Sequence, residues 1–286
     1  MIAVTGASGA LGGRVARLLA ERGVEQRLVV RDESRVPSID GADVAGGCSY
    51  DDAEAMRRGF DGADIVFLVS AGEDLNRVDL HRNAVDAAVA AGVERIVYTS
   101  FASAASDTVF TFGRDHFHTE EHIRSSPLRW TFLRDNIYLD FMPYFAGEDG
   151  VIRGPAGDGR AAVVARADVA ASAAVVLTEP GHEDTAYELS GPEAITLREA
   201  AEQVSRAAGR PVSYVPETLE EARASRAPTG APDWEIEGWV TSYAVIAAGE
   251  LEHVSDDVER LIGREPMTLE RFLRERPESY AHLAPS

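Results

Sequence analysis

The first thirteen residues constrain the fold of this chain more than any other part of its sequence. Ile2–Thr5 is a short run rich in β-branched residues, residues 6–12 (GASGALG) follow directly, and apolar residues at helical spacing come next. A strand, a G-x-x-G-x-x-G turn and a helix in this order are typical of a dinucleotide-binding βα unit. The glycines allow a sharp turn close to a pyrophosphate, and the first N–H groups of the helix favour its negative charge. A plain glycine-rich turn is the alternative, but here the motif lies between a strand and a helix, as dinucleotide binding requires.

Strand-like and helix-like segments alternate through the first half of the chain. Further strands are predicted over 26–30, 64–69, 95–99 and 130–133. Helices are predicted over 51–60, 76–91 and 117–124. This alternation predicts an α/β fold of the Rossmann type, a doubly wound parallel sheet with helices on both faces.

After residue 135 the pattern becomes less regular. A strong turn signal lies over 154–159, a strand is predicted over 186–190, and helices are predicted over 167–177, 196–208, 234–252, 256–261 and 269–276. We predict an NAD(P)-binding domain over 1–135, with 165–180 packing back on it. Residues 136–286 are predicted to form a smaller substrate-binding α/β lobe, interleaved with the main sheet.

The chain contains no lysine, so all 28 basic residues are arginine. Schiff-base chemistry is therefore excluded. The Tyr-x-x-x-Lys pair of ordinary short-chain dehydrogenases is excluded as well, because no amine is present to lower a tyrosine pKa or to hold a ribose.

Charge and composition narrow the partners. The formal net charge of −20 disfavours nucleic acids and anionic membranes, whose phosphates would be repelled. Strand residues follow Met1 directly and no apolar run is long enough for a bilayer, so we expect no signal peptide, no membrane span and a cytoplasmic protein. Cys48 is the only cysteine, which excludes an intrachain disulfide and favours a small buried residue. No spacing of His, Asp and Glu suggests a metal site.

The end of the second predicted strand bears on the choice of cofactor. In dinucleotide-binding folds an acidic residue there accepts a hydrogen bond from the ribose of NAD, whereas an arginine accommodates the 2′-phosphate of NADP. Arg31 comes first after the strand and Asp32 is next. A guanidinium suits a phosphate well, so we predict NADP(H), with NAD(H) as the alternative that Asp32 keeps open.

Short motifs in the same order along nearly the whole chain carry a family resemblance. They are residues 2–12 (IAVTGASGALG), 30–31, 81–84 (HRNA), 90–93, 98–100 (YTS), 116–120 (HFHTE), 157–159, 166–168 (RAD) and 261–263. The chain resembles the NmrA-like group of atypical short-chain dehydrogenases. Within that group it is most similar to the quinone oxidoreductase type 2 and triphenylmethane reductase kind.

The resemblance implies a cofactor site in a cleft between the Rossmann-type domain and the smaller lobe. The cofactor contacts that it implies are Gly6, Ser8, Gly9, Ala10, Leu11 and Gly12 at the pyrophosphate, Arg31 at the 2′-phosphate, Ser70 at the ribose, and His116 at the nicotinamide ribose. The family often has Asp at the position of Ser49, and Arg-Asn-Gly where this chain has residues 134–136 (RDN). We take Asn136 in that loop as a further candidate cofactor contact.

The family resemblance also bears on the chemistry, because it aligns one helix of this chain with the helix that carries Tyr-x-x-x-Lys in ordinary short-chain dehydrogenases. Phe112 stands at the position of the usual tyrosine and His116 at that of the lysine. Glu120 lies one turn further, where it is expected to orient His116 or, as the alternative, to form an ordinary ion pair of the helix. Phe112 cannot donate a proton, which reduction of a simple ketone needs. A quinone or a dye cation delocalises the incoming hydride charge, so its product is weakly basic. The candidate catalytic residues are His116, Ser100 and Tyr138. The alternative for His116 is a structural, capping role, and the alternative for Ser100 is that of a simple hydroxyl at a strand end. His118 is expected to face solvent.

The expected activity is therefore NADPH-dependent hydride transfer to quinones or similar electron-poor aromatic acceptors. Aromatic and methionine side chains are candidates for a pocket that stacks flat substrates, although half of them are expected in the core: Phe101, Phe112, Tyr138, Phe141, Met142, Phe145, Trp234 and Trp239. Two alternatives stay open. One is a non-catalytic regulator of the NmrA type that binds NADP(H) and exposes a partner surface near 227–233. The other is a biosynthetic reductase or isomerase. The sequence does not indicate an oligomeric state.

Overall fold

The computed structural model describes residues 1–36 and 38–283, and the chain divides into two compact units. Unit 1 contains residues 1–101, 115–134 and 166–187. Unit 2 contains residues 102–114, 135–165 and the chain from 188 onward. The segment 102–114, which the sequence analysis assigns to the first domain, therefore belongs to unit 2.

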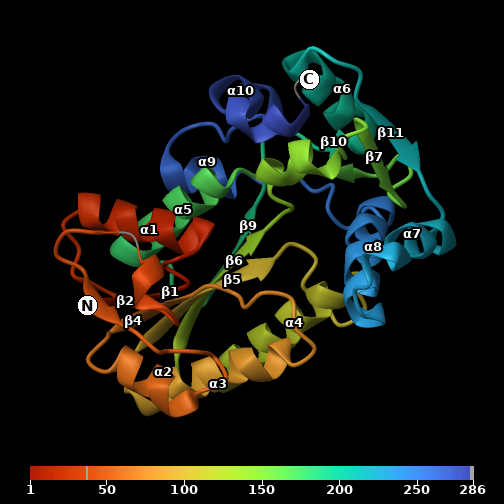
Figure 1. Cartoon of the computed structure of the whole chain (residues 1–286). Helices are drawn as coiled ribbons and strands as arrows, with labels where there is room; N and C mark the ends of the chain where they lie inside the picture. Colours follow the sequence, from red (N-terminus) through yellow and green to blue (C-terminus); the bar gives the residue numbers. More distant parts are fainter. Residues whose placement is uncertain (37, 284–286) are drawn as a thin grey trace. The chain divides into compact units, whose positions relative to one another are not determined.

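Unit 1 is built on a seven-stranded sheet with the order β3-β2-β1-β4-β5-β6-β9 (Figure 1). Its strands are β1 (Ile2–Thr5), β2 (Gln26–Val29), β3 (Asp43–Ala45), β4 (Ile65–Leu68), β5 (Arg95–Phe101), β6 (Arg129–Asp135) and β9 (Thr185–Leu189). The pairs from β3 to β5 are parallel, with Val4 opposite both Leu28 and Phe67. The direction of strand succession reverses between β1 and β4, which confirms the predicted doubly wound α/β architecture.

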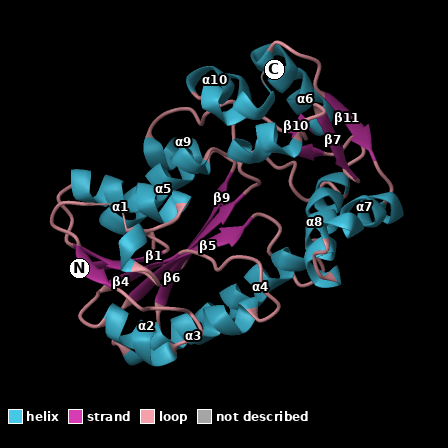
Figure 2. Cartoon of the chain, in the orientation of Figure 1, coloured by secondary structure: helices cyan, strands magenta, loops and turns pink. Residues whose placement is uncertain are grey.

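Helices cover both faces of this sheet (Figure 2). On one face lie α1 (Ala10–Glu21) and α5 (Arg166–Thr178), which Arg22 joins by donating to the Ala174 carbonyl at 2.9 Å. On the other face lie α2 (Ala53–Phe60), α3 (Arg77–Ala90) and α4 (Thr111–Ser125). Alternate strand residues such as Val66, Leu68 and Ile96 pack against these helices in one buried core.

Unit 2 contains two small sheets and most of the remaining helices. The sheets pair β7 (Val151–Gly154) with β11 (Ser213–Pro216) in parallel, and β8 (Arg160–Ala161) with β10 (Ile195–Thr196) in antiparallel orientation. The helices are α6 (Leu197–Ala208), α7 (Leu219–Arg226), α8 (Asp233–Ala247), α9 (Asp257–Ile262) and α10 (Leu269–Glu275). Short 3-10 helices lie at η2 (Leu139–Phe145), η3 (Ala227–Thr229) and η4 (Pro277–Leu283), while η1 (Glu33–Arg35) belongs to unit 1.

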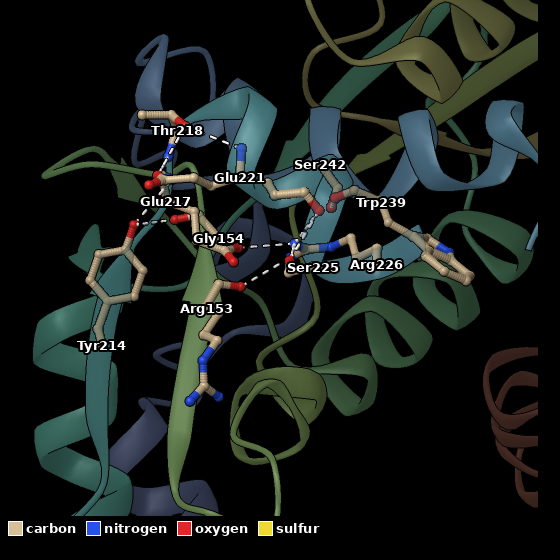
Figure 3. Close-up of polar contacts among 12 residues, drawn as sticks. Arg153, Gly154, Tyr214, Glu217, Thr218, Glu221, Ser225, Arg226, Trp239 and Ser242 are labelled. Carbon is tan, nitrogen blue, oxygen red and sulfur yellow. Dashed lines mark hydrogen bonds and ion pairs between the residues drawn. The ribbon is translucent and has the colours of Figure 1, made fainter. Parts of the chain in front are cut away.

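A partly buried arginine joins the elements of unit 2 around β7 (Figure 3). Arg226, at the end of α7, pairs with Glu217 at 3.0 Å and donates to the Arg153 carbonyl in β7 at 3.0 Å. Its guanidinium also lies 5.3 Å from the ring centre of Tyr243 in α8. A Cβ atom on Gly154 would lie 2.3 Å from that ring, so glycine lets β7 and α8 approach closely. We call Arg226, Glu217 and Tyr243 the Arg226 network.

Cys48 is buried, as predicted, and burial raises the pKa of its thiol. Over residues 1–36 and 38–283, no helix has the length and apolar character that crossing a membrane demands. The same part of the chain holds no group of three or more His, Cys, Asp or Glu side chains arranged to bind a metal ion.

Candidate functional site

The glycine-rich loop after β1 has a shape that side chains would prevent. Gly6 has a φ angle of +62°, and its carbonyl accepts from the Gly9 N–H at 2.8 Å, which closes a tight turn. A Cβ atom on Gly12 would lie 2.4 Å from the Gly6 oxygen, so the loop and α1 pack directly against each other. A Cβ atom on Gly6 would lie 3.1 Å from Val69 Cβ, at the end of β4. The loop therefore follows the path that a pyrophosphate-binding turn takes.

The N-terminus of α1 is suited to an anion. Gly9 is its N-cap, no side chain caps the helix, and its first turn holds no acidic residue. Ser8, Gly9 and Ala10 are exposed, whereas Leu11 and Gly12 are buried beneath them. The first N–H groups of a helix bind negative charge when no side chain satisfies them. The residues present therefore fit a dinucleotide pyrophosphate.

Arg31 and Asp32, which follow β2, occupy different environments. Arg31 is exposed. One carboxylate oxygen of Asp32 accepts from the Ser34 N–H at 2.9 Å and from its hydroxyl at 2.7 Å, which caps η1. These hydrogen bonds lower the pKa of Asp32. Because Asp32 is engaged in its own turn, Arg31 stays the candidate of the two for the 2′-phosphate of a cofactor.

His116 lies in the interior of unit 1, between α3 and β5. Arg77 contacts its Nε2 atom at 3.0 Å, and the Tyr98 hydroxyl lies 2.9 Å from its Nδ1 atom. Since a guanidinium can only donate, we assign Nε2 as the acceptor and place the proton on Nδ1. Burial, aided by the positive charge of Arg77, lowers the pKa of His116 well below 6.5. The ring is therefore neutral at pH 7 and stacks on Phe101 at 6.1 Å.

Glu120 does not orient His116, in contrast to the sequence expectation. Its fully buried carboxylate accepts from the Ser100 hydroxyl at 2.6 Å and binds Arg134 through two bonds of 2.9 and 2.7 Å. Arg124 contacts it at 3.0 Å. Although Glu120 follows His116 by one helical turn, two guanidinium groups attract its carboxylate more strongly than a neutral imidazole does. His118 is exposed, as predicted.

The remaining candidates divide between the two units. Ser70, in unit 1, is half-buried after β4, and its N–H donates to Thr99 Oγ1 at 2.8 Å. In unit 2 the Tyr138 hydroxyl donates to Asp135. The buried Asn136 side chain donates to the Leu251 carbonyl at 3.0 Å and so joins distant segments of unit 2.

The expected aromatic pocket is distributed over several environments. Phe112 is buried, with its ring 6.4 Å from that of Trp234, and Met142 is also buried. Phe141 is 41% exposed and lies beside Tyr138. In unit 2, Trp234 also lines a groove of about 650 Å³ between α7 and α8, whose other lining residues are Arg223, Ala224, Ala227, Asp233, Ile236 and Glu237. This groove has both an aromatic and a charged wall.

Sequence reasoning missed several side chains that support these candidates. Arg77 is 6% exposed and His81 is fully buried, although both lie on a helix with weak amphipathic character. Their spacing of four residues places them on one helix face, which is the signal that the sequence offered. Thr5 and Tyr50 form side-chain hydrogen bonds to the backbone of Val69, after the end of β4. No local sequence pattern predicts these hydrogen bonds.

This chain is similar in sequence and structure to known proteins. The model of the NmrA-like family matches residues 1–273. Quinone oxidoreductase 2 of Escherichia coli is 33% identical over 293 residues, which cover 99% of this chain and 98% of that protein. Its structure in complex with NADPH has a TM-score of 0.88 at 32% identity, covering 96% of this chain and 99% of that one.

Two further proteins are similarly close. The (4-alkanoyl-5-oxo-2,5-dihydrofuran-3-yl)methyl phosphate reductase of Streptomyces griseus is 35% identical over 285 residues, which cover 98% of this chain and 99% of that protein. The structure of Citrobacter sp. triphenylmethane reductase complexed with NADP(H) has a TM-score of 0.86 at 32% identity, covering 96% of this chain and 99% of that one. Family model, sequence and structure agree, and the chain belongs to the NmrA-like family.

Proposed function

We propose that this protein is an NADPH-dependent reductase that delivers a hydride to quinones or similar electron-poor conjugated aromatic acceptors. The use of NADPH as cofactor rests on the uncapped N-terminus of α1 under the glycine loop, with Arg31 exposed after β2. Similar proteins support both the cofactor and the class of acceptor. They are named as an NADPH-dependent quinone oxidoreductase and a triphenylmethane reductase, and the similarity covers almost the full chain.

The residues of this chain have defined tasks in that activity. The glycine loop and the first N–H groups of α1 would hold the pyrophosphate, Arg31 the 2′-phosphate, and Ser70 the ribose. The nicotinamide, when bound, supplies the hydride. In unit 1, His116 remains a candidate contact on the nicotinamide side. In unit 2, Asn136 remains a candidate that would act by fixing its own loop.

The hydrogen bonds of the candidate proton donors support the proposed class of acceptor. Ser100 donates to Glu120, Tyr138 to Asp135, and the Nδ1–H of His116 to Tyr98. Each donor hydrogen is thus already engaged with another protein group. An acceptor whose reduced form is only weakly basic needs no positioned acid, whereas a ketone does. Quinones fit this requirement, because the hydroquinone anion formed by hydride transfer can take its proton from water. Cationic dyes fit as well, because addition of a hydride to the cation gives a neutral product that needs no proton.

A second function has its own support. The Streptomyces griseus relative is named as a reductase of a furanone methyl phosphate, and it is 35% identical to this chain. This name favours a biosynthetic reductase of a conjugated lactone as the alternative. Both reactions would use NADPH and an electron-poor conjugated acceptor, and they differ in the substrate. Either reductase is expected in the cytoplasm, which fractionation of the source cells would test.

The test is anaerobic NADPH oxidation followed at 340 nm, with benzoquinones, naphthoquinones, a triarylmethane dye and an unsaturated lactone as acceptors. We expect turnover with quinones, faster with NADPH than with NADH. Arg31→Ala should weaken NADPH binding by about 10- to 100-fold and leave NADH binding unchanged, because it removes charged hydrogen bonds to the phosphate. Arg35→Ala is the matched control. Tight binding without turnover of any acceptor would instead favour the regulator.

A further inference from the structure

The segment that follows β4, residues 69–71, is held almost entirely by side chains. Three consecutive N–H groups donate at 2.8–2.9 Å: Val69 to Thr5 Oγ1, Ser70 to Thr99 Oγ1 and Ala71 to His81 Nε2. Two carbonyl groups of the segment accept as well: Val69 from the Tyr50 hydroxyl at 2.6 Å and Ala71 from Arg77 Nε at 2.9 Å. The backbone of the 69–71 segment is therefore fixed in one conformation at the point where the sheet ladder ends.

This segment lies where the fold places its ligand. The strand order reverses between β1 and β4, and ligands of open α/β sheets bind beyond the carboxyl ends of the strands at such a point. The side chain of Val69 packs against Gly6 of the glycine loop, as the short distance to a Cβ atom there shows. The 69–71 segment and the glycine loop are thus two adjacent walls of the same site.

Both polar groups of Ala71 are bound by one face of α3. The Ala71 N–H donates to His81, and Arg77, one turn earlier in α3, donates to the Ala71 carbonyl. The imidazole of His81 can accept at Nε2 only when its proton is on Nδ1, which lies 2.8 Å from the Thr119 hydroxyl in α4. Arg77 also contacts Nε2 of His116 in α4, so a single guanidinium binds the 69–71 segment and a candidate cofactor contact.

We propose that Arg77 and His81 are positioning residues for dinucleotide binding, which hold both polar groups of Ala71 and thereby keep the 69–71 segment in the shape that receives the cofactor ribose. This inference rests on the proposed function. Neither residue touches the cofactor in this scheme; both act through the backbone of Ala71. Their effect is therefore on the affinity for the nucleotide and is the same for NADPH and NADH, because the 2′-phosphate lies at Arg31.

The experiment measures the dissociation constants of NADPH and NADH by fluorescence titration of the full-length protein. His81→Leu removes the acceptor, whereas His81→Gln offers an amide oxygen close to the position of Nε2. We expect His81→Leu and Arg77→Met to weaken both dinucleotides by about tenfold, the effect of one lost buried hydrogen bond. His81→Gln should stay within about threefold of wild type. Arg82→Met, whose exposed side chain pairs with Asp79 on the same helix, is the control and should change nothing.

Steady-state kinetics give a second readout that a general loss of packing would not produce. In His81→Leu the KM for NADPH should rise, while kcat at saturating NADPH stays within about twofold. If Arg77→Met does not fold, the pair of His81 variants decides the question. Wild-type affinity in His81→Leu, or an equal loss in His81→Gln, would overturn the inference. If wild type bound neither dinucleotide, the proposed function would fail together with the inference. Loss of NADPH preference in Arg31→Ala, with unchanged affinity in His81→Leu, would overturn the inference alone.

Discussion

Arg77 in unit 1 and Arg226 in unit 2 are both largely buried and both donate to a backbone carbonyl, but they differ in the further contacts described above. Arg226 pairs with the carboxylate of Glu217 at 3.0 Å and covers an aromatic ring, and its contacts join β7, α7 and α8. Arg77 donates to the Ala71 carbonyl at 2.9 Å and contacts the imidazole of His116 at 3.0 Å, and the carboxylate of Asp115 lies 3.8 Å away. The first arrangement joins structural elements, whereas the second fixes a backbone segment beside a candidate ligand site. The comparison teaches that burial of an arginine does not reveal its role, but the chemistry of its partners does.

The largest effect is expected from a substitution that breaks the Arg226 network. Arg226→Met leaves the carboxylate of Glu217, which is 10% exposed, without its partner. Because an unpaired buried charge is costly, we expect the free energy of unfolding to fall by about 3 kcal/mol, measured by urea denaturation. The dissociation constant of NADPH should not change in the folded protein. An affinity loss as large as that of Arg77→Met would abolish the distinction between the two arginines.

Arg223→Met is the matched control for that variant. Arg223 pairs with Glu237 at 2.7 Å, but both side chains are more than a third exposed. Solvent screens such a pair, so its loss should cost less than about 1 kcal/mol. Equal losses in the two variants would contradict the role given to the Arg226 network.

Acid should sharpen the comparison, because two buried histidines, His81 and His116, lie beside Arg77. The pKa values of His81 and His116 are lowered well below 6.5, mainly by burial and then by Arg77. The unfolded chain therefore binds protons more readily than the folded one, so this stability is complete above pH 6.5 and is lost as the pH falls below it. At pH 5 the loss reaches up to about 2 kcal/mol for each histidine.

Urea denaturation at pH 7 and pH 5 measures this loss. His116→Gln should reduce the difference in unfolding free energy between the two pH values, because a glutamine does not titrate. Arg223→Met, which removes an exposed ion pair, should leave that difference as it is in wild type. If His116→Gln had the same pH dependence as wild type, the neutral state assigned to His116 would be wrong.

The smallest of these effects is expected when the hydroxyl group of Ser100, in β5, is removed. Ser100 donates to Glu120 at 2.6 Å, and its side chain is buried. Ser100→Ala should lower the free energy of unfolding by about 1.5 kcal/mol, as expected for a hydrogen bond to a charged group. Because its hydrogen is already donated, kcat with a quinone should stay within about twofold. A fall of kcat by a hundredfold at unchanged stability would instead establish Ser100 as catalytic.

The parts of the fold that local patterns determine were predictable from the sequence. The glycine loop and the alternation that builds the sheet each depend on neighbouring residues, and the structure shows both. The start of α4 was predicted too late, at 117 instead of Thr111. The strands β7 and β11 were missed because their pairing joins residues about sixty positions apart, and neither strand alternates clearly enough to be recognised alone.

The candidate site was predictable to a smaller extent. Arg31 could be proposed because its role depends only on its place after a strand. The partners of His116 could not, since Arg77 lies 39 residues earlier and Tyr98 18 residues earlier in the chain. The prediction that Glu120 orients His116 used helical spacing alone and was wrong, because Arg134 on β6 attracts the carboxylate. Spacing identifies which residues are able to meet, but charge determines which of them do.

The division of the chain into units has a consequence for engineering and for folding. The polypeptide passes between unit 1 and unit 2 five times, after residues 101, 114, 134, 165 and 187. No single cut separates the units, so neither can be expressed alone as one continuous piece or exchanged as a cassette between homologues. Each unit also needs segments that leave the ribosome at different times. Co-translational folding of an isolated N-terminal half is therefore disfavoured, and unit 1 cannot be complete before residue 187 has been synthesised.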